Sequence, residues 1–253
     1  MGKVVPLPGR DGGLPDAVLR PVRDGNAFES TVEHLANAIR VGVFAPGERL
    51  PPERELAERL GVGRATLREA IGALRQAGLV TTTRGRAGGT VVVHPGEAVP
   101  EGASGTVGRA RPTPTAEEVA DVLVFRRVVE PAAAALAAAA ALPGERRAWL
   151  TRSLEEAVAP KDDAARRVAD ARLHLAVAAL AGSPLLLDAV TQVQARVSEL
   201  LAAIPVLKAN IEHSDLQHAA IVEAILRGDA GGARRVMEEH CDATSALLRG
   251  LIG

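Results

Sequence analysis

Residues 47–70 read GERLPPERELAERLGVGRATLREA, and this stretch decides the fold of the first part of the chain. It contains two short helical patterns separated by Gly61, a residue type that commonly ends helices in the left-handed conformation. Pro52 stands where a first-turn proline is tolerated, and a new helical pattern starts near Gly63. The spacing therefore predicts two helices joined by a tight turn.

The residues on either side extend this pattern. Ser30 is placed to cap an earlier helix. After the third helix, the runs 79–83 and 90–93 flank a glycine-rich tip and are typical of a small hairpin. Three helices followed by a hairpin predict a winged helix-turn-helix domain over residues 28–93.

Beyond this domain the composition changes. Residues 1–27 lack periodicity and predict a mobile tail, and residues 94–114 are rich in Pro, Gly and small residues, which predicts a linker. Residues 115–253 show helical periodicity almost throughout, with Pro and Gly breaks that delimit six or seven helices. We expect a mainly α chain in which a winged helix-turn-helix is joined to an all-α bundle.

Composition narrows the class of protein. The fractions of apolar residues (47%) and charged residues (24%) are typical of a folded chain. Aromatic residues are rare, with no Tyr, one Trp and three Phe, so we expect a core of Ala, Val and Leu. The apolar runs are too short to cross a bilayer and the start lacks a cleavable leader, so we expect a cytoplasmic protein. The single Cys241 excludes an internal disulfide framework.

Charge is distributed unevenly. The net charge of −1 argues against indiscriminate nucleic-acid binding, and residues 115–253 hold 15 basic against 19 acidic side chains. Between Gly63 and Arg86, however, five Arg stand against one Glu. A basic surface is therefore focused on the third helix and the hairpin.

The third helix has the side chains of a major-groove reader. Arg64 and Arg68 lie four residues apart, so they project from one face toward successive base pairs, where Arg can donate twice to guanine. Thr66 is placed to contact a phosphate or a thymine methyl group. Arg54 lies where the preceding helix would cross the DNA backbone, and the basic hairpin tip can reach an adjacent groove.

The segments GERLPPERELA (47–57) and LGVGRATLREA (60–70) resemble the DNA-binding domain of the GntR family of bacterial transcription regulators. The resemblance covers nearly all of residues 28–93. In that family the corresponding helix arginines contact operator DNA and the wing tip contacts the minor groove. This sequence departs from the family pattern at Gly63, where the family more often has Ser or Thr, so the helix lacks a side-chain cap at this position. The DNA-binding residues that we expect are Arg54, Arg64, Thr66, Arg68, Arg84, Gly85 and Arg86.

Four side chains of the second domain have the chemistry of a divalent metal site. Asp170 and His174 lie about 40° apart around a helix, near enough to bind one ion, and His218 and His240 follow on later helices. One carboxylate and three imidazoles suit Zn²⁺, Ni²⁺, Co²⁺, Mn²⁺ or Fe²⁺, and we favour Zn²⁺. His213, five residues before His218, should face elsewhere. Taken alone, His residues in a helical bundle are more often hydrogen-bonded core or surface residues than metal ligands.

Most of residues 116–248 resemble the all-helical effector-binding domain called FCD, which accompanies the winged helix in the FadR-like branch of the GntR family. The matching segments are RRVVEP (126–131), DARLH (170–174), HAAIVEAI (218–225) and MEEH (237–240). Leu173 replaces a more usual Phe. Members with this Asp, His, His, His pattern bind a divalent metal, which a small carboxylate effector approaches. The resemblance thus implies the metal ligands Asp170, His174, His218 and His240.

Arg126 is the candidate for binding the carboxylate of that effector, because its planar guanidinium can donate to both oxygens. A surface ion pair with Asp121 or Glu130 explains the same residue equally well.

The leading functional hypothesis is a ligand-responsive transcription regulator, usually a repressor, that binds an inverted-repeat operator as a homodimer. Its partners would be double-stranded DNA and a small organic acid, with no membrane. The alternative is a metal-dependent enzyme with a DNA-targeting winged helix. Since the sequence has no His-Glu-x-x-His motif, phosphate loop or nucleophile elbow, we expect no enzyme. The acidic balance of the second domain opposes a purely architectural DNA binder.

Overall fold

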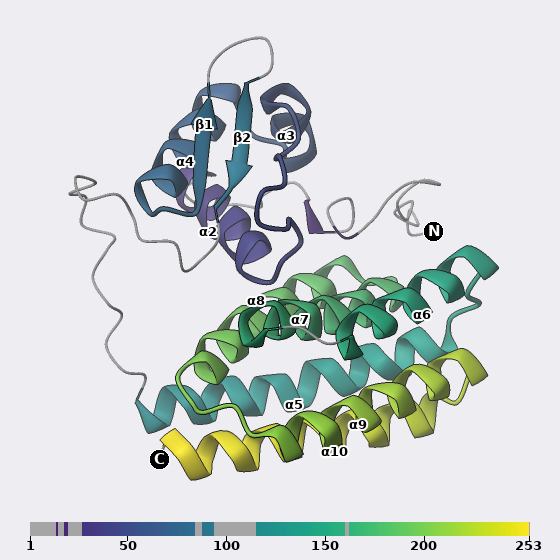
Figure 1. The fold of residues 1–253 in the computed structure, drawn as a ribbon. Coiled ribbons are helices and arrows are strands. Elements are labelled where there is room, and N and C mark those ends of the chain that lie inside the picture. The colour runs from purple at the N-terminus through teal and green to yellow at the C-terminus, as the bar shows by residue number, and fades with distance from the viewer. Residues whose placement is uncertain are drawn as a thin grey trace. The chain divides into compact units, whose positions relative to one another are not determined.

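The computed structural model describes residues 14, 18, 19, 27–83, 88–93, 115–159 and 162–252. The chain divides into two compact units, Met1–Pro112 and Thr113–Gly253. Figure 1 shows the first unit with helices and a hairpin, and the second as helices alone. Almost all of the predicted tail and the whole of the predicted linker, residues 94–114, lie outside the described residues.

The first unit is a winged helix-turn-helix, as predicted. Its helices are α2 (Ala27–Arg40), α3 (Glu53–Leu60) and α4 (Arg64–Gln76), and its antiparallel hairpin consists of β1 (Val80–Thr83) and β2 (Gly89–Val92). In the hairpin, Val80 lies opposite Val92. The prediction that Ser30 caps the first helix is wrong, because α2 begins at Ala27 and Ser30 lies inside its first turn.

The turn between α3 and α4 depends on Gly61. Its φ of +64° is the left-handed conformation, from which its N–H points back to the carbonyls of Ala57 and Glu58. Gly63 then precedes α4 in an extended conformation without a side-chain cap, as the sequence indicated. Leu56 on α3 and Leu67 on α4 are both fully buried, and the two helices pack against each other.

The second unit contains six helices among the described residues, which agrees with the six or seven expected. They are α5 (Ala116–Ala139), α6 (Gly144–Val158), α7 (Asp163–Leu180), α8 (Pro184–Ala202), α9 (Lys208–Arg227) and α10 (Ala230–Ile252). Helix α5 packs against α7, α8, α9 and α10, and it runs through the middle of the unit (Figure 1).

Local hydrogen bonds set the helix ends. Thr115 and Glu118 form a capping box, in which each side chain accepts a hydrogen bond from the backbone N–H of the other residue. Ser183 accepts a hydrogen bond at the start of α8. Gly228 ends α9 with a φ of +75°, and Asp229 then accepts from the first turn of α10. These signals place the breaks between helices where the sequence predicts them.

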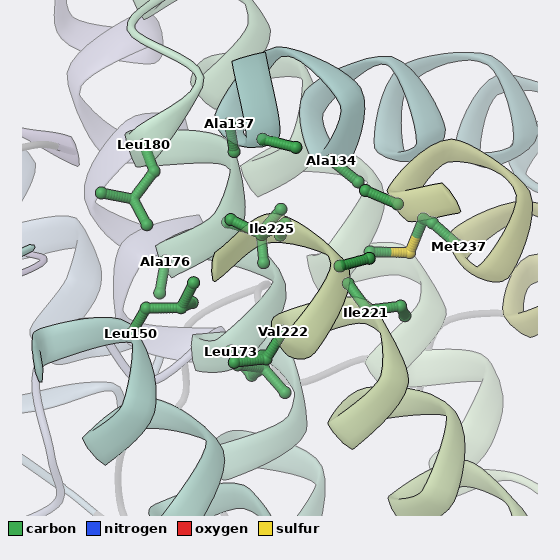
Figure 2. Packing of buried hydrophobic residues seen from close by; sticks show 14 of the residues in the cluster. Ala134, Ala137, Leu150, Leu173, Ala176, Leu180, Ile221, Val222, Ile225 and Met237 are labelled. Atoms are coloured by element: carbon green, nitrogen blue, oxygen red, sulfur yellow. The ribbon is translucent and has the colours of Figure 1, made fainter. Parts of the chain in front are cut away.

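Small aliphatic residues form the main core of the second unit. Figure 2 shows Ala134, Ala137 and Ala176 among Leu, Ile and Val side chains, with Met237 at one edge. The residues of this cluster come from α5, α6, α7, α9 and α10. Because alanine side chains are short, the helix backbones approach closely and leave no gap for large aromatic rings. The composition predicted this kind of core. Within the described residues, no helix is both long and apolar enough to cross a membrane.

We expect Leu150→Ala to lower the free energy of unfolding of the second unit by about 2–5 kcal/mol, because Leu150 is fully buried in this cluster. Trp149, the single Trp of the chain, packs against the same cluster, so its fluorescence during urea denaturation reports on this unit. The control is Leu185→Ala, at a side chain that is 61% exposed, where we expect a change within about 0.5 kcal/mol. Equal losses in the two variants would contradict this packing.

Candidate functional site

Three imidazoles meet inside the second unit. His174 lies on α7, His218 on α9 and His240 on α10, and all three are buried. Their ring centroids are 4.7 to 5.4 Å apart, and one nitrogen of each ring lies within 4.8 Å of the others. Helices that begin far apart in the sequence thus bring three possible metal ligands to one point.

Asp170 lies beside this cluster, one helical turn before His174. Its Oδ1 is 3.3 Å from Nε2 of His218, and its Oδ2 is 4.0 Å from Nε2 of His174. The structure therefore brings the four side chains of the predicted metal site together. His213, which the sequence predicted to face elsewhere, is exposed.

The cluster fits a metal ion because one nitrogen of each ring lacks a hydrogen-bond partner. Among the described residues, Nε2 of His174, His218 and His240 are all buried without a hydrogen bond. Nδ1 of His240 lies 3.1 Å from the amide oxygen of Gln217, so with that acceptor Nδ1 carries the proton and Nε2 keeps its lone pair. Unpaired buried nitrogens are costly, and a bound cation would satisfy them.

Burial keeps these rings in the form that binds metals. Desolvation lowers the pKa of His218 to about 4, and it lowers the pKa of His240 well below its usual value. Both rings are therefore neutral at pH 7, and neutral imidazole is the form that ligates metal ions.

Glu130 on α5 lies directly behind the cluster. It accepts hydrogen bonds from Arg126 Nε at 3.1 Å and from Gln194 Nε2 at 2.6 Å, and its Oε2 is 2.8 Å from Nδ1 of His174. Burial alone would raise the pKa of Glu130, but Arg126 and His174 outweigh it and hold the pKa at about 2. A carboxylate on the far nitrogen of a ligating His orients the ring and strengthens it as a donor.

Arg126 lies in the interior of the bundle. The alternative that it forms a surface ion pair is therefore wrong, although one of the two partners it named, Glu130, is the observed one. Its side chain is 1% exposed and paired with Glu130 from within the bundle. Burial alone would lower its pKa, but Glu130 outweighs this effect and the pKa is raised. Nη1 of Arg126 has no hydrogen-bond partner within the described residues, and the side chain lines a cavity.

This cavity has a volume of about 110 Å³ and borders on Arg126, Asp170 and His240. A small molecule inside it would therefore reach both the guanidinium and two side chains of the predicted metal site. Its apolar wall comes from the end of α8, the segment that follows, the start of α9 and one residue of α10: Leu201, Ile204, Pro205, Val206, Leu207, Ile211 and Leu247.

Sequence reasoning missed two further residues. Arg166 lines the same cavity, and its spacing of four from Asp170 and eight from His174 on α7 is a helical signal that could have identified it. Gln194 on α8 has no such signal, because only the packing of α8 against α5 brings it to Glu130.

The predicted DNA-binding side chains lie on α3 and α4 of the first unit. Arg64 and Arg68 are exposed, and Thr66 is half-buried. Arg68 Nε donates to Oε2 of Glu53 at 2.8 Å, which ties α4 to α3. Arg54 pairs with Glu58 at 3.3 Å on α3 itself. The predicted wing contacts at residues 84–86, namely Arg84, Gly85 and Arg86, lie outside the described residues.

Two family models match the chain. The model described as bacterial regulatory proteins of the gntR family matches residues 28–92, and the FCD domain model matches residues 121–243. Together they cover the winged helix-turn-helix and most of the helical unit, including the four side chains of the predicted metal site.

Curated relatives and solved structures agree with these matches. The chain is 35% identical to RmpR of Mycobacterium gastri, named as an HTH-type transcriptional regulator, over 88% of this chain and 80% of that protein. It is 31% identical to the HTH-type transcriptional repressor NanR of Salmonella schwarzengrund, over 92% and 88%. The fold is similar to that of McbR/YncC of E. coli, with a TM-score of 0.53, 20% identity and coverage of 90% and 99%.

We expect Glu130→Gln to lower the free energy of unfolding by about 3–5 kcal/mol, because it leaves the charge of Arg126 buried without a counterion. The control is Glu223→Gln, which removes a surface pair with Arg227 and should cost less than about 1 kcal/mol. Urea denaturation followed by Trp149 fluorescence measures both. If Glu130→Gln unfolds no more easily than the control, Glu130 does not compensate Arg126.

Proposed function

Because the chain belongs to the GntR family of bacterial regulatory proteins and carries an FCD domain, we propose that it is a transcriptional repressor whose DNA affinity responds to a small carboxylate. It binds an inverted-repeat operator as a homodimer in the bacterial cytoplasm. The observation that carries the ligand response is the cluster of buried, unpaired imidazole nitrogens beside a cavity that Arg126 lines.

The first unit reads the operator. Helix α4 enters the major groove, where the exposed Arg64 and Arg68 donate to base edges, and Thr66 and Arg54 contact the backbone. The wing residues Arg84, Gly85 and Arg86 contact the adjacent minor groove. The predicted repression agrees with the relative named as a transcriptional repressor.

Dimerisation follows from the mode of reading, because one recognition helix contacts too few base pairs for useful specificity. An apolar stripe on α5 supports this part of the proposal. Val124, Val128 and Leu136 are 61%, 63% and 48% exposed, and their spacing places them along one side of that helix. A second copy of the chain that covers this stripe would remove it from water.

The second unit holds a divalent cation through Asp170, His174, His218 and His240. We favour Zn²⁺, and Ni²⁺, Co²⁺, Mn²⁺ or Fe²⁺ suit the same donors. When bound, such an ion supplies a positive centre that attracts and polarises a carboxylate oxygen.

Arg126 binds the effector carboxylate through its free Nη1, while Glu130 keeps the guanidinium in place from the opposite side. Because Glu130 also contacts His174, the carboxylate-binding residue and a metal-binding residue share one support. Effector binding then changes DNA affinity through a coupling free energy between the two units. The comparisons give no support to the alternative of a metal-dependent enzyme, since these relatives are transcription regulators.

We expect the double variant His174→Ala, His218→Ala to lose the bound metal, because it removes two of four ligands. Elemental analysis of purified protein after gel filtration measures the metal-to-chain ratio. His213→Ala is the matched control, because His213 lies on α9 with His218 but is exposed, and it should keep the wild-type ratio. One metal ion per chain in the double variant would exclude these residues as the ligands.

For DNA binding we expect Arg64→Ala and Arg68→Ala each to cost about 1–3 kcal/mol on a duplex selected from random sequences by the wild-type protein. Both variants should also relax base preference. Arg75→Ala, at an exposed residue near the other end of α4, should keep that preference. Fluorescence anisotropy at one fixed salt concentration measures the affinities. Wild-type affinity in both variants would refute α4 as the reading element.

A further inference from the structure

Arg166 lies in line with two of the residues assigned to the metal. It precedes Asp170 by four residues and His174 by eight on α7, so the three side chains share one face of that helix. Four residues correspond to about 6 Å along a helix axis. Arg166 therefore lies about one helical turn from Asp170, and both residues line the same cavity.

The guanidinium of Arg166 has an unmet donor. Its Nη1 is buried and has no hydrogen-bond partner within the described residues. The nearby Asp215 lies on α9, and its Oδ2 is 3.6 Å from this nitrogen, which is an ion-pair distance but too long for a hydrogen bond. Asp215 thus forms an ion pair with this nitrogen but does not accept a hydrogen bond from it.

The cavity consequently has two unsatisfied guanidinium donors. Both arginines line the cavity, and Nη1 of each lacks a hydrogen bond among the described residues, although Nη1 of Arg166 keeps its ion pair with Asp215. The wall between α8 and α9 is apolar, with Ile204 and Val206 among its residues. A ligand that satisfies the site would therefore carry an anionic group for each arginine, joined by a short carbon chain.

The size of the cavity limits the length of that chain. At about 110 Å³ it is somewhat smaller than the roughly 150 Å³ engineered protein cavity that accepts benzene. A ligand of a few carbons with two planar carboxylates fits this limit, and planar guanidinium groups match carboxylates through paired hydrogen bonds.

We infer that the effector is a small dicarboxylate, and that Arg166 binds the carboxylate distant from the metal and selects dicarboxylates over monocarboxylates. This inference rests on the proposed function, because it assumes that the cavity beside the metal-binding residues is the effector site. Arg126 binds the carboxylate nearer the metal, and Arg166 determines the preference for dicarboxylates over monocarboxylates.

The test measures binding to the full-length, metal-loaded protein by isothermal titration calorimetry. Malate is compared with 2-hydroxybutyrate, which has a methyl group in place of the far carboxylate. A longer pair, 2-hydroxyglutarate and 2-hydroxyvalerate, covers a second chain length. In at least one pair we expect the dicarboxylate to bind about 10- to 100-fold more tightly, as for hydrogen bonds to charged groups.

The variant Arg166→Gln should remove this preference and leave monocarboxylate affinity unchanged, whereas Arg126→Gln should weaken both acids. Arg227→Gln, at an exposed arginine on α9 that pairs with Glu223, is the matched control and should keep the preference. Arg166→Lys retains the charge without the planar fork, and we expect an intermediate preference. Circular dichroism and metal content confirm that each variant is folded and loaded.

Equal affinity of the wild-type protein for both members of each pair would overturn the inference while leaving a carboxylate effector in place. An equal loss for both acids in Arg166→Gln would also overturn it. If none of the four acids binds the metal-loaded wild-type protein, the inference falls together with the proposed carboxylate effector. The wild-type comparison decides the matter even if an Arg166 variant does not fold.

Discussion

The carboxylate of Glu130 carries a negative charge inside a bundle built from alanine, valine and leucine. A charge in such surroundings needs compensation, and three neighbours provide it: Arg126, Gln194 and His174. These neighbours come from α5, α8 and α7, so a single carboxylate constrains how three helices lie against one another. The orientation of His174 depends on this constraint, and through His174 so does the cluster of imidazoles.

Close packing makes the cluster possible. Alanines on α5 and α7 let neighbouring helices approach, and His174, His218 and His240 therefore meet although they come from three different helices. The cavity opens next to them where α8 ends and α9 begins, at a break that contains Pro205. Helices thus carry the side chains of the predicted metal site, whereas the segment between α8 and α9 forms part of the wall that a ligand would touch.

Features that depend on local sequence were predictable. The turns at Gly61 and Gly228 follow from residues that favour a positive φ, and the pairing of Asp170 with His174 follows from their spacing on one helix. The start of α2 was misplaced because Ser30, a good cap in isolation, lies within a helix that already begins at Ala27.

Features that depend on tertiary packing were not predictable from spacing. The approach of His218 and His240 to His174 was expected only from the family resemblance. The interior position of Arg126 was missed because arginine is rarely buried unless it is paired. The spacing of four residues allowed an ion pair with Glu130, but only the packing of other helices around α5 shows that this pair is buried. The same reason explains why Gln194 went unnoticed.

The ion pair between Arg68 and Glu53 bears on the proposed reading of operator DNA by α4. A guanidinium held by a neighbouring carboxylate must leave it before it can bind a base, and exchanging an exposed pair costs about 1 kcal/mol or less. A guanine in the right place offers two acceptors and favours the exchange, whereas a mismatched base does not. Under the proposed role of Arg68 in reading the operator, the pair with Glu53 would favour keeping the side chain beside α3 wherever no matching base is present.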